Sequence, residues 1–158
     1  MLVHAFISSR LDYCNSLLYG ITDGLLQKLQ SVQNAAARLV TGARRRDHIT
    51  PVLRDLHRLP VRQRIAFKIA CVVFQSLSGQ APEYLINDCR LVTGSRRSSD
   101  SRMCCVPRTH NRFGDRSFTA SGPHLWNSLP KDLRQADLSY EHFKRQLKTH
   151  LFRDHGAL

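Results

Sequence analysis

The segment LPVRQRIAFKIACVVFQSLSG, residues Leu59–Gly79, has the pattern of one buried helix. Pro60 suits the first helical position, because its missing N–H group would have no partner inside the helix there. Gly79 suits the left-handed residue that ends a helix. Between residues 65 and 74 the only strongly polar side chain is Lys68, so nearly every face of the helix is apolar. This pattern predicts a central helix that is surrounded by other elements.

The predicted helix begins among arginines, although the positive end of a helix dipole favours carboxylates. The eight arginines between residues 38 and 64 are offset by only two acidic residues, Asp47 and Asp55. Such a run is ordinarily a solvated face with some internal ion pairs. Because free N–H groups beside several guanidinium groups suit a phosphate, we instead predict contacts to a nucleic-acid backbone. The predicted nucleic-acid-binding residues are Arg38, Arg44, Arg45, Arg46, Arg54, Arg58, Arg62 and Arg64.

The charge of the whole chain favours the same class of partner. The 158 residues carry 24 basic and 12 acidic side chains, a net charge of +12, which points to nucleic acid or another anionic surface. Five of the basic residues are lysine and the others are arginine, which binds phosphate in a fork and stacks on bases. The length and the 42% hydrophobic content predict one domain with a core, with room for a small appendage.

The number of cysteines and the hydropathy of the sequence indicate where in the cell the protein is expected. Five cysteines, an odd number, with no signal peptide before them indicate a reducing environment. No apolar stretch approaches the length that spans a bilayer. We therefore expect an intracellular protein, nuclear or cytoplasmic, with no membrane partner.

The rest of the sequence predicts a mainly α fold. Apolar periodicity predicts a helix over residues 2–19 that buries Cys14, a second over 25–41 that ends at Gly42, and a short third over 50–57. With the central helix these form a helical bundle. The second helix is expected to bury one stripe, formed by Leu25, Leu29, Val32, Ala36, Leu39 and Val40.

Beyond the central helix the pattern weakens. Residues 92–101 are polar, basic and aperiodic, which predicts a flexible basic linker between a bundle over 1–91 and a region over 102–158 that packs back on the bundle. In that region we expect a small β-hairpin, with strands at 103–107 and 116–120. Trp126 is expected to pack back on the bundle. A C-terminal amphipathic helix, capped by Ser139, is expected to bury Phe143, Leu147, Leu151 and Phe152.

Several strings together resemble the carboxyl-terminal region of reverse transcriptases from jockey-like and related non-LTR (LINE-type) retrotransposons. These are LDYCNSLLYG (11–20), LQKLQSVQNAAARLVTGARRRDHITPVLRDLHRLPVRQRIAFKI (26–69), APEYL (81–85), GDRSFTASGPHLWNSLP (114–130) and FKRQLKTHLF (143–152). The resemblance covers essentially the whole chain. It implies a region that follows the polymerase palm and thumb and accompanies bound RNA or DNA, in a copy that begins at an internal methionine.

The polymerase activity of that family is not expected here. Two-metal chemistry needs carboxylates that converge on the ions, and this sequence contains no Asp-Asp pair. We therefore expect a fragment that is not an enzyme, uses no cofactor and binds RNA or DNA, with the upstream domains of the reverse transcriptase as further partners. The alternative is a structural or partner-docking module that covers the thumb, whose exposed apolar surface would cause self-association.

The sequence gives little support for a metal site or a hydrolase active site. The set Cys89, Cys104, Cys105 and His110 lacks the paired spacing of zinc ligands, so no metal site is expected. A hydrolase is not indicated, because the sequence contains none of the motifs Gly-x-Ser-x-Gly, His-Glu-x-x-His and Gly-x4-Gly-Lys. Phe113 and Trp126 could stack on a base, although a lone tryptophan is more often a core anchor.

Overall fold

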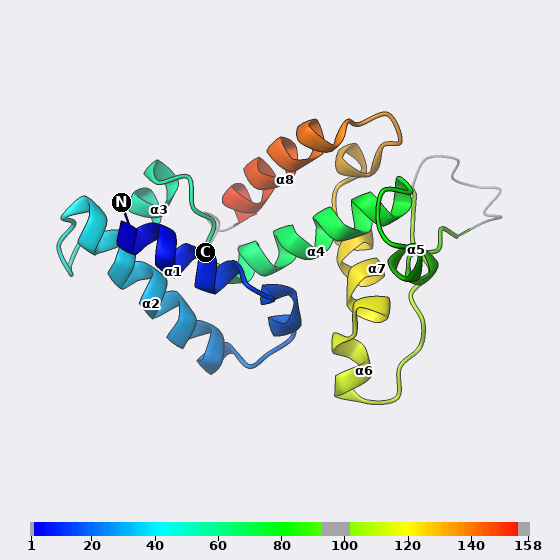
Figure 1. Cartoon of the computed structure of the whole chain (residues 1–158), viewed down its shortest axis with the longest axis horizontal. Helices are drawn as coiled ribbons and strands as arrows, with labels where there is room; N and C mark the ends of the chain where they lie inside the picture. The colour runs from blue at the N-terminus through cyan, green and yellow to red at the C-terminus, as the bar shows by residue number, and fades with distance from the viewer. Residues whose placement is uncertain (1, 93–101, 155–158) are drawn as a thin grey trace. The chain divides into compact units, whose positions relative to one another are not determined.

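The computed structural model describes residues 2–92 and 102–154, which are drawn in colour in Figure 1. These residues form eight α-helices and two short 3₁₀ helices without a β-strand, which confirms the mainly α prediction. Apart from Val92, the predicted linker lies outside the described residues. The chain divides into two compact units, the first running up to Ile65 and resuming at Thr149, the second lying between them. The predicted division at 92–101 stays a prediction.

The first unit is built on a pair of helices, α1 and α2, that pack against each other, with α3 packed on α2. A 3₁₀ turn, η1, separates α1 from α2. The elements are α1 (Leu2–Asp12), η1 (Asn15–Leu18), α2 (Asp23–Thr41) and α3 (Ile49–Asp55), followed by the start of α4 (Val61–Leu77).

The first predicted helix is shorter than the sequence suggested. It ends at Asp12 because Cys14 takes a left-handed conformation, with φ of +50°. The prediction that one helical stripe continues through Leu17 is wrong, since the break changes the direction of every later side chain. Cys14 is consequently exposed and not part of the core.

The face that α2 buries also differs from the prediction. Its end is as predicted, because Gly42 has φ of +72° and donates its N–H to Arg38 O. Ala36 is buried as predicted, but Leu25, Val32 and Leu39 are 51%, 50% and 71% exposed. The other buried residues of α2 are Gln33 and Ala37. Small side chains let a neighbouring segment approach closely, which favours this face over the one with the larger apolar residues.

Two glutamines of α2 explain why a polar residue lies in the core of the first unit. Gln33 Nε2 donates to Leu59 O at 2.9 Å, and Gln30 Oε1 accepts from Val61 N at 2.8 Å. Gln30 Nε2 also donates to Gln33 Oε1 at 3.0 Å. These amides satisfy the backbone of the segment that enters α4, so α2 presents this polar face inward.

The predicted central helix is confirmed as α4, Val61–Leu77. Gly79 has φ of +70°, and Gln80 N donates to Gln75 O at 2.9 Å while Gly79 N donates to Ser76 O at 3.2 Å. These two bonds form the Schellman arrangement that satisfies the last carbonyls of a helix. Ile69, Ala70 and Val73 are almost completely buried, as the apolar pattern predicted.

The second unit surrounds an aromatic cluster. Phe74 of α4 stacks on Phe143 of α8 with ring centroids 4.4 Å apart, and Trp126 of α7 lies 5.9 Å from Phe143. Trp126 is fully buried and its indole N–H donates to Arg102 O at 2.7 Å, so it is a core anchor. Besides most of α4, this unit contains α5 (Glu83–Asp88), α6 (Arg112–Arg116), α7 (Phe118–Ser128), η2 (Lys131–Arg134) and the part of α8 (Tyr140–Asp154) up to Lys148.

The predicted β-hairpin is wrong. Residues 116–120 fall at the end of α6 and the start of α7, and Cys104 forms an isolated bridge with Leu91 instead. Asn127 fixes this bridge from α7, because its amide bonds both the N–H and the carbonyl of Cys104 at 2.8 Å. The backbone partners of this segment therefore come from an upstream segment and a helix, which the local pattern could not indicate.

The C-terminal helix agrees with its prediction. Ser139 Oγ accepts from His142 N at 3.3 Å, and Phe143, Leu147 and Leu151 are buried. The exception is Phe152, which was predicted to be buried but is only half-buried. Neither α8 nor any other helix in the described ranges is long and apolar enough to cross a bilayer.

Candidate nucleic-acid interface

The eight predicted arginines do not form one cluster in the first unit. Arg62 pairs with Asp23, the first residue of α2, whereas Arg38 lies in the last turn of α2. The 19 residues of α2 rise about 27 Å from end to end. Arg62 and Arg38 therefore lie near opposite ends of this helix, which already separates the predicted set.

The loop after α2 forms a turn, Arg44–Asp47, which we name the arginine turn. Asp47 N donates to Arg44 O at 3.1 Å, and Arg44 N donates to Asp47 Oδ2 at 2.6 Å. Arg45 and Arg46 occupy the two central positions, and the side chains of all three arginines are exposed. The only acidic side chain of the loop thus bonds the backbone, which shapes the turn and leaves the guanidinium groups facing water. Arg38 supports the turn through Nη2, 3.5 Å from Asp47 O.

Arg54 and Arg58 follow at the end of α3. Arg54 is exposed in the last helical turn, where the negative end of the dipole favours a cation. His57 has φ of +53°, and Arg58 N then donates to Leu53 O at 2.8 Å, which leaves the Arg58 side chain half-buried. Across the described ranges, no carboxylate forms an ion pair with the arginines of this end or of the arginine turn.

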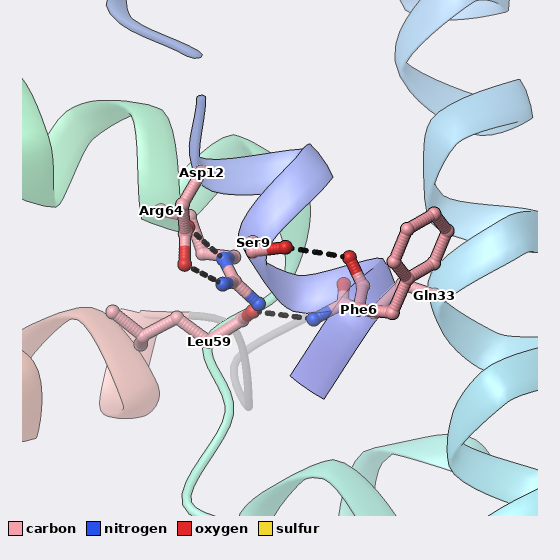
Figure 2. Close-up of polar contacts among 6 residues, drawn as sticks. All are labelled: Phe6, Ser9, Asp12, Gln33, Leu59 and Arg64. Carbon is pink, nitrogen blue, oxygen red and sulfur yellow. Dashed lines mark hydrogen bonds and ion pairs between the residues drawn. The ribbon is translucent and has the colours of Figure 1, made fainter. Parts of the chain in front are cut away.

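The start of α4, where the sequence suggested an anion site, is satisfied from within the chain. Arg64 makes a two-bond ion pair with Asp12 (Figure 2). Its Nε lies 2.8 Å from Asp12 Oδ1. Arg62 pairs with Asp23 at the surface, and the first N–H of the helix is bound by Gln30. Arg64 is only 8% exposed. The carboxylates that the helix dipole favours are therefore supplied by α1 and α2.

A groove of about 620 Å³ lies beside this ion-paired end, among α2, α3 and the start of α4. Its polar lining includes Asp23, Arg62, Gln27 and Gln30, and Leu26, Leu53 and Val61 make it partly apolar. Because the charges of Asp23 and Arg62 offset each other, the groove has no excess positive charge for a phosphate. It is distinct in character from the arginine turn.

Three of the five cysteines, Cys71, Cys89 and Cys104, are buried. In the part of the chain that the structure describes, no three or more His, Cys, Asp or Glu side chains converge as metal ligands. Burial raises the pKa of the Cys104 thiol to about 12 and that of Cys89 to about 11, so both stay protonated at neutral pH. Cys105 is exposed on the other side of its strand-like segment. Thiolates are the metal-binding form of cysteine, and the expectation that the chain holds no metal stays a prediction.

Two exposed apolar features remain, one that the sequence pattern placed in the core and one, Phe113, that it named as a possible base-stacking residue. The stripe Leu25, Val32 and Leu39 on α2, which we name the α2 stripe, was predicted to be buried but faces solvent. Phe113 on α6 is 80% exposed between arginines. The exposure of Phe113 could have been predicted from the sequence. The residue lies between Arg112 and a glycine in a polar segment, where no other apolar residues have the spacing of a buried helix face.

Comparisons with protein-family models, with curated proteins and with solved structures found no match. The interpretation of the site therefore depends on its own geometry and charge.

Proposed function

We propose that this chain binds RNA or DNA through phosphate-backbone contacts made by the arginine turn together with Arg54. The single observation that carries the proposal is the turn itself, in which Arg44, Arg45 and Arg46 are exposed while Asp47 bonds the backbone. Arginine forks bind phosphate oxygens with paired hydrogen bonds. The net charge of +12 supports a polyanionic ligand over a single small anion.

The resemblance to the carboxyl-terminal region of non-LTR retrotransposon reverse transcriptases supports the same proposal. On this proposal the chain is a non-catalytic part of such an enzyme, because it has no Asp-Asp pair for two-metal chemistry. Its upstream polymerase domains would be its protein partners. Arg62 and Arg64 are left out of the proposed contacts, since each is already paired with a carboxylate of the same chain.

Fluorescence anisotropy with a labelled DNA duplex at several salt concentrations tests the proposal. Four phosphate contacts predict a fall in affinity of about 150-fold between 50 and 200 mM salt, from a slope of about −3.6. The triple variant Arg44→Gln, Arg45→Gln, Arg46→Gln should retain about one contact and lose only about 3.5-fold over the same range. An unchanged salt slope in this variant would show that the turn does not bind the backbone.

A control removes the same charge elsewhere. Lys28, Lys131 and Arg153 are exposed and lie on α2, η2 and α8. The triple variant with glutamine at these positions has the same net charge as the arginine-turn variant. It should retain a salt slope close to that of the unsubstituted chain, because it leaves all four proposed phosphate contacts in place.

A second candidate function is self-association or docking through the α2 stripe. Leu25, Val32 and Leu39 are seven residues apart and at least half exposed, so they form one continuous apolar line on the helix. Sedimentation velocity over a range of concentrations tests this role. Association that disappears in the variant Leu25→Ser, Leu39→Ser would support it, and a concentration-independent monomer would exclude self-association.

A further inference from the structure

Phe113 is the most exposed large apolar side chain of the described residues, at 80%. It lies on α6, a short helix whose ends are closed by local hydrogen bonds. Asn111 Oδ1 accepts from Gly114 N at 2.6 Å, and Ser117 Oγ donates to Gly114 O at 2.6 Å. The hydroxyl of Thr109 donates to the carboxylate of Asp115, which folds the preceding loop against the helix. The ring is therefore exposed on an ordered support.

The surroundings of this ring are basic. Arg112 precedes it, and the contact between Thr109 and Asp115 brings Arg108 next to the same helix. Both arginines are exposed, and within the described ranges neither forms a hydrogen bond or an ion pair. Asp115, the acidic residue of α6, is bonded by Thr109. By contrast, the exposed ring of Phe6 is already covered by the guanidinium of Arg10, 5.3 Å from its centroid.

We propose that Phe113 is a stacking platform for an unpaired base of RNA or DNA, with Arg108 and Arg112 binding the adjacent phosphates. An exposed aromatic ring can stack on a base while the arginines beside it bind backbone phosphates. A single strand exposes the faces of its bases, whereas a duplex stacks them inside the helix. A protein partner with an apolar patch alone would leave the two guanidinium groups without acceptors. This inference rests on the proposed function and adds a preference for single strands.

Anisotropy with one labelled strand and with the duplex of the same sequence tests the inference. Phe113→Ala should weaken single-strand binding by about 5- to 150-fold, and duplex binding should stay within about twofold. Phe113→Trp should retain the affinity of the unsubstituted chain, because indole also stacks. Since Phe113 is exposed, circular dichroism melting of both variants should match that of the unsubstituted chain.

The Phe113→Trp variant also gives a direct readout. Trp126 is fully buried, so the introduced indole would be the exposed fluorophore, and a stacked base should quench it. Quenching by the single strand with none by the duplex supports the platform. Equal losses of single-strand and duplex affinity in Phe113→Ala, or no loss in either, would overturn it.

Failure of the platform and failure of the proposed function give different results. If the arginine-turn variant loses its salt slope while Phe113→Ala binds as before, only the platform is wrong. If the unsubstituted chain binds neither form of nucleic acid, both are wrong. A change in sedimentation in Phe113→Ala without a change in single-strand affinity would assign the ring to a protein contact and also overturn the platform.

Discussion

The ion pair between Asp12 and Arg64 has a role that mutation can separate from nucleic-acid binding. Arg64 is 8% exposed and its guanidinium makes two bonds to Asp12, whose side chain is 50% exposed. Asp12→Asn would leave a buried cation without its carboxylate. Exposed pairs contribute up to about 1 kcal/mol and breaking a fully buried pair costs about 3–5 kcal/mol, so this half-exposed pair should cost about 2 kcal/mol.

Urea unfolding at pH 7 measures the cost. With a slope of about 2 kcal/mol/M, Asp12→Asn should lower the midpoint by about 1 M. Arg64→Met should cost less, because it leaves Asp12 unpaired where water can hydrate it. The double variant should be no less stable than Asp12→Asn alone, since the buried charge is then gone.

Nucleic-acid affinity gives the result that would refute this reasoning. If Arg64 only stabilises the fold, Asp12→Asn should leave affinity and salt slope unchanged at a temperature where the variant is folded. If Arg64 instead binds phosphate when released, Asp12→Asn should tighten binding and make the slope steeper by about 1. An increase of that kind would return Arg64 to the set of binding residues and contradict a purely structural role.

Three further predictions concern the fold. Phe143→Ala removes a fully buried ring stacked on the core and should cost about 3–5 kcal/mol in urea unfolding. Iodoacetamide at pH 8 should label Cys105 but not its buried neighbour Cys104. Burial raises the pKa of Cys104 in the folded chain from 9.0 to about 12. The contribution of Cys104 to the free energy of unfolding is therefore full below pH 9 and is lost as the pH rises toward 12. Gly79→Ala, at φ of +70°, should destabilise by about 1 kcal/mol, whereas Gly24→Ala, in α2 with open space around it, should stabilise by up to about 1 kcal/mol in the same assay.

Features that depend on neighbouring residues were predictable from the sequence. The ends of two helices followed from Gly42 and Gly79, because a left-handed residue closes a helix through bonds to its own last turn. The buried character of α4 followed from its apolar composition on all sides. The cap by Ser139 and the spacing of apolar residues in α8 are equally local.

Features that depend on distant partners were not predictable. The two carboxylates that bind Arg62 and Arg64 lie 39 and 52 residues away, and no local pattern identifies them. The burial of Gln33 depends on the carbonyl of Leu59, which is 26 residues distant. The sequence of α2 does not say which side of the helix meets its neighbours. Of the predicted stripe, Ala36 is buried, whereas Leu25, Val32 and Leu39 face solvent.

The acidic residues of the first unit explain why its two ends differ in charge. Asp12 and Asp23 neutralise arginines at the end where α4 begins, while Asp47 at the other end bonds a backbone amide and neutralises no guanidinium group. Positive charge therefore remains in excess near the arginine turn, and the α2 stripe lies along the helix between the two ends. A polyanion and an apolar partner would use different surfaces of this unit, so charge substitutions in the turn and polar substitutions in the stripe should have independent effects.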